Sequence, residues 1–217
     1  MALKIIGVLV VILAGFGVYV AMQPADFTVE RSATMAAPPA IVFAQVNDFH
    51  NWPNWSPWEK LDPAMEKTFS GAPAGTGAAY AWSSKDKNVG AGQMTITSAK
   101  MPERIDLKLD FLEPFKATNN VVFNFTPEGE GTKVNWAMSG QKNFVMKAFC
   151  LFQDMDKMVG ADFEKGLSAL AATSETKAKE AQAQAAAEAQ AAQAAADAQA
   201  QAAAPAPEAP KVKAKKR

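Results

Sequence analysis

Residues 105–111 alternate strictly between apolar and charged side chains. A period of two is typical of a β-strand with one face in a core and the other in water. The sequence therefore predicts an antiparallel sheet with one buried face. The buried face of this strand would carry Ile105, Leu107, Leu109 and Phe111, and the solvated face Asp106, Lys108 and Asp110.

Other short segments with strand character surround this one, and turn residues separate them. The run of Glu and Gly at 128–131 is typical of a hairpin turn. Between the first and second strands, prolines favour two short helical or looped segments over 38–58 instead of one long helix. The further strands are expected at 27–32, 65–69, 79–83, 91–99, 117–125 and 133–139.

After the last strand, apolar residues recur at three- and four-residue spacing over 144–172, the pattern of one amphipathic helix. A helix of this length spans roughly 42 Å, which is enough to cover a whole sheet. Strands with helices segregated from them define an α+β domain. The apolar stripe of the helix consists of Phe149, Phe152, Met155, Val159, Phe163, Leu167 and Leu170.

Residues 5–22 form an uncharged, apolar run of 18 residues near the N-terminus. This length is at the lower end of what spans a hydrocarbon core of about 30 Å. The absence of a polar face disfavours a buried core helix, whereas a cleaved signal peptide stays an alternative to a retained anchor. Because Tyr19 is a poor −3 residue for cleavage after Ala21, we expect a retained single-pass anchor.

Lys4 and the N-terminal amine precede this run, and Asp26 and Glu30 follow it. The positive-inside rule then keeps the N-terminus in the cytoplasm and places the rest of the chain outside. We expect a protein of a bacterial inner membrane whose domain faces the periplasm. The expected parts are an anchor at 1–23, a domain at 24–173 and a low-complexity tail at 174–217.

The tail is rich in Ala and Gln from 178 to 204 and has no large apolar residue there. Alanine favours helix, but such a helix has no apolar face to bury. We therefore expect a solvated, partly helical extension. Its basic end at 211–217 has two open interpretations: contact with anionic lipid headgroups or another polyanion, and a solvated terminus without a partner.

The composition excludes several classes of site. Lys plus Arg and Asp plus Glu both number 22, so no global positive field recruits nucleic acid. Cys150 and His50 are the single cysteine and the single histidine, which leaves too few ligands for a Cys/His zinc site. We expect no metal, no cofactor and no identifiable catalytic residue. Cys150 is interpreted as a small hydrophobe, and His50 as structural or exposed.

The segment Ala37-Pro38-Pro39-Ala40-Ile41-Val42-Phe43, followed by Asp48 and by Trp52, Trp55 and Trp58, resembles the START-like (SRPBCC, helix-grip) superfamily. Phe69-Ser70-Gly71, Gly75, Gly77 and the last helix look like its bacterial polyketide cyclase/dehydrase and lipid transport branch. The resemblance covers 27–170. It implies a curved antiparallel sheet that grips the long C-terminal helix, with a cavity between them for a hydrophobic molecule.

The expected inner faces carry almost no polar groups, and flexible methionines there suit a site that adapts to its ligand. The three tryptophans have alternative roles: lining the cavity mouth, lying at headgroup level, or packing the short helices on the sheet. The candidate ligand-binding residues are Trp52, Trp55, Trp58, Met94, Leu107, Leu109, Phe111, Phe123, Phe125, Trp136, Met138, Phe152, Met155, Val159 and Phe163.

Arg31 falls on the inner face of the first strand. A charge there needs a partner, either an acid such as Asp110 or Glu113, or a polar ligand head. The expected function is binding or presentation of a lipid or another hydrophobic small molecule at the membrane surface. A polyketide cyclase-like enzyme and an envelope interaction module with a filled core are the alternatives, and the sequence identifies no protein partner.

Overall fold

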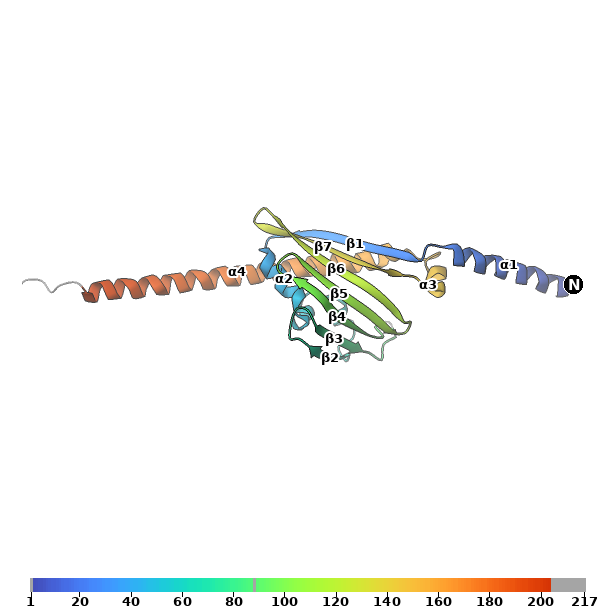
Figure 1. The fold of residues 1–217 in the computed structure, drawn as a ribbon, viewed down its shortest axis with the longest axis horizontal. Helices are drawn as coiled ribbons and strands as arrows, with labels where there is room; N and C mark the ends of the chain where they lie inside the picture. Colours follow the sequence, from blue (N-terminus) through green and yellow to red (C-terminus); the bar gives the residue numbers. More distant parts are fainter. Residues whose placement is uncertain (1, 88, 204–217) are drawn as a thin grey trace, which may run out of the picture. The chain divides into compact units, whose positions relative to one another are not determined.

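The computed structural model describes residues 2–87 and 89–203. Its core is a seven-stranded antiparallel sheet with the order β1-β7-β6-β5-β4-β3-β2 (Figure 1). The strands are β1 (Asp26–Met35), β2 (Glu66–Gly71), β3 (Ala78–Ser83), β4 (Ala91–Lys100), β5 (Arg104–Glu113), β6 (Ala117–Glu128) and β7 (Gly131–Gln141). The helices are α1 (Ala2–Met22), α2 (Pro39–Asn47), η1 (Phe49–Asn54), η2 (Pro57–Lys60), α3 (Phe144–Phe149) and α4 (Met155–Ala203).

Every expected strand is present, and the α+β architecture predicted from the alternating segments is confirmed. The alternation of β5 places Ile105 and Leu107 in the core, because a strand presents successive side chains to opposite faces. Register shifts within β4, at Ala91/Gly92 and Ile96/Ser98, interrupt its pairing with β5. Irregularities of this kind bend a strand and curve the sheet.

The strand register defines two ends of the sheet. At the first end, Asp26 of β1 pairs with Gln141 of β7, and α1 precedes β1 by three residues. We call this the α1 end. The turn from β5 to β6 lies at the same end, because the antiparallel register continues from β7 through β6 to β5. At the opposite end, Met35 pairs with Thr132 beside the β6–β7 turn.

The prediction of one continuous helix over 144–172 is wrong in one respect, because the helix is interrupted between α3 and α4. Each helix has its own N-cap. The side chain of Asn143 accepts a hydrogen bond from the Met146 N–H at 2.9 Å, and that of Asp154 accepts one from the Lys157 N–H at 3.2 Å. Such caps satisfy the free N–H groups of a first helical turn, so the residues between them form a turn.

α4 extends beyond the expected end at residue 172 and continues to Ala203. Its contacts with the domain reach into the segment expected to be solvated, because Ser174 and Ala178 are buried. The Glu175 carboxylate also accepts a hydrogen bond from the Ala36 N–H at 3.2 Å. From 179 to 200 the side chains are exposed. The basic end at 211–217 lies outside the described residues.

α1 is the one helix among the described residues that is long and apolar enough to cross a membrane, by length and composition, over Lys4–Met22. From Lys4 onward its side chains are exposed except near its end, where Val20 is buried. There it contacts α3, and Lys147 Nζ donates a hydrogen bond to the Ala21 carbonyl at 3.1 Å. The end of α1 is thus held against the domain at the α1 end of the sheet.

Candidate functional site

A cavity of about 240 Å³ lies on the inner face of the sheet, between the strands, η2 and α4. Its wall is almost entirely apolar and rich in aromatic rings. The lining residues are Trp52, Ser56, Trp58, Glu59, Leu61, Met65, Tyr80, Trp82, Val89, Met94, Leu109, Phe111, Val121, Trp136, Met138, Val159, Asp162 and Phe163.

The cavity occupies only the half of the inner face that is nearer the α1 end. The pairs Met94–Leu109 and Val121–Met138 lie in this half, and all four of these residues line the cavity. The other half is solid, because α2, η1 and the residue after η1 fill it with side chains such as Phe43 and Trp55.

Hydrogen bonds hold the indole rings of Trp52 and Trp55 in place. The indole N–H of Trp52 donates to the Val46 carbonyl at 3.0 Å, and that of Trp55 donates to the Gln45 carbonyl at 3.1 Å. A buried tryptophan usually finds such a partner for its N–H group. Of the three roles considered for the tryptophans, Trp55 has the packing role alone, because it belongs to the core and not to the cavity wall, whereas Trp52 and Trp58 contribute to the wall.

The candidate residues divide according to these two halves. Those in the cavity wall are Trp52, Trp58, Met94, Leu109, Phe111, Trp136, Met138, Val159 and Phe163. Those in the packed core beside it are Trp55, Leu107, Phe123 and Phe125. Phe152 and Met155 lie in neither set: both border an open depression near α3, Phe152 in the turn before α4 and Met155 as the first residue of α4.

Several lining residues were not among the candidates. Val121 lies on the same alternating face of β6 as Phe123, so the strand pattern could have identified it. Tyr80 and Trp82 alternate along β3 in the same way. Glu59, by contrast, lies in a short 3-10 helix without periodicity, so no sequence pattern identified it.

Glu59 gives the cavity a polar end. Its side chain is only 6% exposed and forms an ion pair with Lys67. The Tyr80 hydroxyl donates a hydrogen bond to Glu59 Oε1 at 2.8 Å. Burial, together with this hydrogen bond, raises the pKa of the Tyr80 phenol far above its usual value. Tyr80 therefore stays protonated and acts as a donor.

The expected partner of Arg31 is wrong: the guanidinium pairs with α4 instead of with Asp110 or Glu113. It contacts the Asp156 carboxylate at 2.9 Å and the Glu164 carboxylate at 2.8 Å. A β-carbon at Gly160 would lie 2.0 Å from Arg31 Nη2, so glycine lets the side chain pass under α4.

Asp110 has other partners, since it accepts a hydrogen bond from Thr118 at 2.6 Å and pairs with Lys108 at 2.9 Å. Asp110 lies on β5, which β6 and β7 separate from β1. Arg31 on the edge strand instead meets α4, and it contributes no group to the cavity wall.

His50 and Cys150 both lie away from the cavity. His50 Nδ1 is 2.7 Å from Asp48 Oδ1, and the ring stacks on Phe69 with centroids 4.2 Å apart. Cys150 is partly exposed beside α3. The part of the chain that the structure describes contains no group of three His, Cys, Asp or Glu residues that could hold a metal ion.

Comparison with solved structures shows the same fold at low identity. SA2116 from Staphylococcus aureus, described as a protein of unknown function, superposes with a TM-score of 0.55 at 12% identity over 72% of this chain and 98% of its own. Mll3558 from Rhizobium loti gives a TM-score of 0.51 at 18% identity over 69% and 98%. An uncharacterised protein from Rhizobium leguminosarum gives 0.52 at 16% identity over 71% and 97%.

No curated protein matches the chain. A family model does, and it covers residues 26–175, from the first residue of β1 into the packed part of α4. Its description is polyketide cyclase/dehydrase and lipid transport. This match agrees with the resemblance carried by the proline-rich entry to α2 and by the three tryptophans. Over its folded domain, the chain belongs to the polyketide cyclase/dehydrase and lipid transport family of the START-like superfamily.

Proposed function

We propose that this domain binds a hydrophobic small molecule in the cavity between the sheet and α4, while α1 holds it at the outer face of a bacterial inner membrane. The observation that carries the proposal is the half-hollow inner face. Its sequence pattern is that of a core, yet the half beside Trp136 and Met138 leaves about 240 Å³ empty. Cores normally contain few voids larger than a water molecule.

The size and chemistry of the cavity favour a small apolar ligand. Ligand pockets are commonly about 300–1,000 Å³, so the resting cavity suits a compact molecule or one segment of a longer one. Met65, Met94 and Met138 line it, and flexible thioether side chains let such a wall adapt to different shapes. Glu59 and Tyr80 at the polar end would orient a ligand that carries one polar group.

The same two residues favour binding over an enzymatic reaction. A general base must lie within hydrogen-bond reach of the proton that it takes, whereas the Glu59 carboxylate is held by two partners of its own, since it accepts hydrogen bonds from Tyr80 on one oxygen and from Lys67 on the other. Tyr80 stays protonated because its pKa is raised. A cyclase-like activity therefore ranks second, and the filled-core interaction module ranks behind it because the inner face is partly hollow.

The membrane location rests on α1. The span Lys4–Met22 has 19 residues, which corresponds to roughly 28 Å of helix, close to the thickness of a hydrocarbon core. Lys4 at the start of the span favours a cytoplasmic N-terminus.

A matched pair of substitutions tests the binding site. Val121→Phe fills the cavity, whereas Val134→Phe adds the same atoms to the packed half, since Val134 is fully buried and outside the cavity wall. The full chain is titrated in detergent with the apolar probe N-phenyl-1-naphthylamine, and the signal from protein-free micelles is subtracted because the probe also partitions into detergent. Energy transfer from tryptophan is recorded, because Trp58 and Trp136 line the cavity.

Val121→Phe is expected to lower probe affinity at least tenfold with little loss of stability. Val134→Phe is expected to keep the affinity and to cost about 1–3 kcal/mol through overpacking. Equal probe affinity in wild type and Val121→Phe would show that the cavity is not the binding site.

A further inference from the structure

Exposed apolar side chains gather at the α1 end of the sheet in two segments that are distant in sequence. One segment is α3 with the turn after it, where Phe152 is 77% exposed. The other is the end of β5 and the turn into β6. We call the six side chains the apolar rim: Leu112, Phe115, Phe144, Val145, Phe149 and Phe152.

The strand register places both segments at one end of the domain. β7 ends at Gln141, opposite the first residue of β1, and α3 follows it. Asn119 of β6 pairs with Gly140 of β7, and Ala117 pairs with Phe111 of β5. The β5–β6 turn therefore lies along the same edge as α3.

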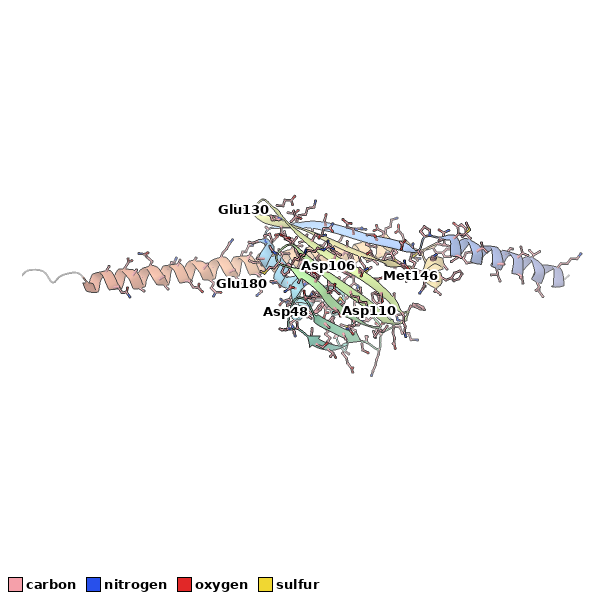
Figure 2. The ribbon with its side chains drawn as sticks, viewed as in Figure 1. Asp48, Asp106, Asp110, Glu130, Met146 and Glu180 are labelled. Carbon is pink, nitrogen blue, oxygen red and sulfur yellow. The ribbon has the colours of Figure 1, made fainter. Side chains whose placement is uncertain are left out.

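The rest of the described surface outside α1 does not repeat this pattern. Its other exposed large apolar side chains come one each from four different segments of the chain: Leu61, Phe69, Met101 and Met158. The β6–β7 turn at the opposite end carries Glu128 and Glu130. Figure 2 shows Glu130 and Met146 of α3 at opposite ends of the sheet. An apolar cluster at one end of a domain marks an interaction site.

We propose that the apolar rim inserts into the outer leaflet of the bilayer beside α1. This rests on the proposed role of α1 as a membrane anchor. If α1 spans the bilayer, Met22 lies at its outer surface. Only three residues separate α1 from β1, and they reach about 11 Å at most. Lys147 of α3 also donates a hydrogen bond to the Ala21 carbonyl. α3 is thus held at the level of the lipid headgroups, where apolar side chains penetrate about 5–10 Å.

The charges at this end are mixed. Lys116, Lys142 and Lys147 lie near Asp26 and Glu113 in the sequence and the register. Burial of the phenylalanines, rather than attraction to anionic lipid, would therefore provide most of the attachment.

The rim would also bring the cavity close to the bilayer. The hollow half of the inner face is the half nearer the α1 end, and the cavity-lining Phe111 directly precedes Leu112 of the rim. A hydrophobic ligand leaving the leaflet at the rim would reach the cavity without crossing the packed half of the domain.

Depth-dependent quenching tests the insertion on the full chain. In a Cys150→Ser background, single cysteines are introduced by Phe115→Cys, Phe152→Cys and, as the matched control, Glu130→Cys. Each is labelled with the environment-sensitive dye NBD. The protein is reconstituted in vesicles of phosphatidylethanolamine and phosphatidylglycerol, with and without a lipid that carries a shallow doxyl quencher. The ten residues of β1 separate the control position from the α1 end by about 30 Å.

We expect blue-shifted emission and at least a twofold loss of fluorescence with the doxyl lipid at positions 115 and 152, and neither effect at 130. Absence of quenching at 115 and 152 on protein that floats with the vesicles would overturn the proposal. A blue shift without quenching would also overturn it, since it would show that a protein surface covers the rim. Protein that fails to float would refute the anchor itself, whereas the naphthylamine titration tests ligand binding separately.

Discussion

Trp136 of β7 and Phe163 of α4 stack with ring centroids 4.1 Å apart and planes inclined by 7°. Phe123 of β6 stacks on Trp136 as well, at 4.8 Å. Both phenylalanines belong to the buried core, but only Phe163 also lines the cavity. Trp136 therefore stands at the boundary between the solid and the hollow halves of the inner face.

Alanine substitutions on the two sides of this boundary should differ. Phe123→Ala removes a fully buried ring that also contacts Trp52 and Trp55. It should lower the free energy of unfolding by about 3–5 kcal/mol, the usual result of a new void in a packed core. Phe163→Ala enlarges an existing cavity, so its cost should be smaller while probe affinity changes several-fold. Urea unfolding and the naphthylamine titration measure the two effects. The reverse order of costs would contradict the half-hollow description.

The sheet was predictable because its strands are antiparallel with one buried face, so that each apolar side chain on a strand such as β5 marks the inner side. The boundary between core and cavity was not predictable. Leu107 and Leu109 share one alternating face, yet Leu107 is in the core and Leu109 is in the cavity wall. The difference arises from α2 and η1, whose positions depend on tertiary packing and not on any periodicity within β5.

The missed break between α3 and α4 has a local cause. The stripe of apolar residues over 144–172 continues through the turn between α3 and α4, so periodicity alone did not reveal the break. The caps at Asn143 and Asp154 were the available signals, since Asn and Asp favour helix N-termini. Phe152 therefore belongs to the exposed rim and not to the cavity.

The raised pKa of Tyr80 predicts that the free energy of unfolding decreases at alkaline pH. Burial, and then its hydrogen bond to Glu59, raise the pKa of the phenol. The stabilising effect is complete below the unfolded pKa of about 10 and is lost as the pH rises towards the folded value. The free energy of unfolding should therefore fall more steeply above pH about 10 in wild type than in Tyr80→Phe. Urea melts between pH 8 and 11 measure this, and parallel profiles would show that Tyr80 is not involved.

The lowered pKa of Asp156 predicts that stability decreases at acidic pH. Its hydrogen bond from Arg31 lowers the pKa of the carboxyl below its usual value of 3.8. This contribution is present above pH about 4 and is lost as the pH falls through the lower folded value. Asp156→Asn should therefore lower the thermal midpoint at pH 6 and approach wild type near pH 3. Asp197→Asn, far along α4, is the control and should change neither value. A constant difference across the range would exclude the ion pair as its source.

The topology of the anchor has a direct test. Alkaline phosphatase fused after Arg217 should be active, because only a periplasmic fusion folds, whereas a green fluorescent protein fusion at the same site should be dark. The mature chain should retain residues 5–22 by N-terminal sequencing or intact mass. An inactive phosphatase fusion would contradict the predicted orientation. A mature chain that starts after Ala21 would show that the segment is a cleaved signal peptide.

Two truncations test where the functional domain ends. A stop after Ala178 removes only the helix beyond the compact unit and should leave the thermal midpoint within a few degrees. A stop after Thr173 also removes buried Ser174 and Ala178 and the hydrogen bond from the Ala36 N–H to Glu175. Its cost should be about 2 kcal/mol, or roughly 4–8 °C for a chain of this size. Equal midpoints for the two truncated chains would mean that residues 174–178 add no stability. A large decrease in the midpoint of the chain that ends at Ala178 would mean that the Ala/Gln helix itself supports the domain.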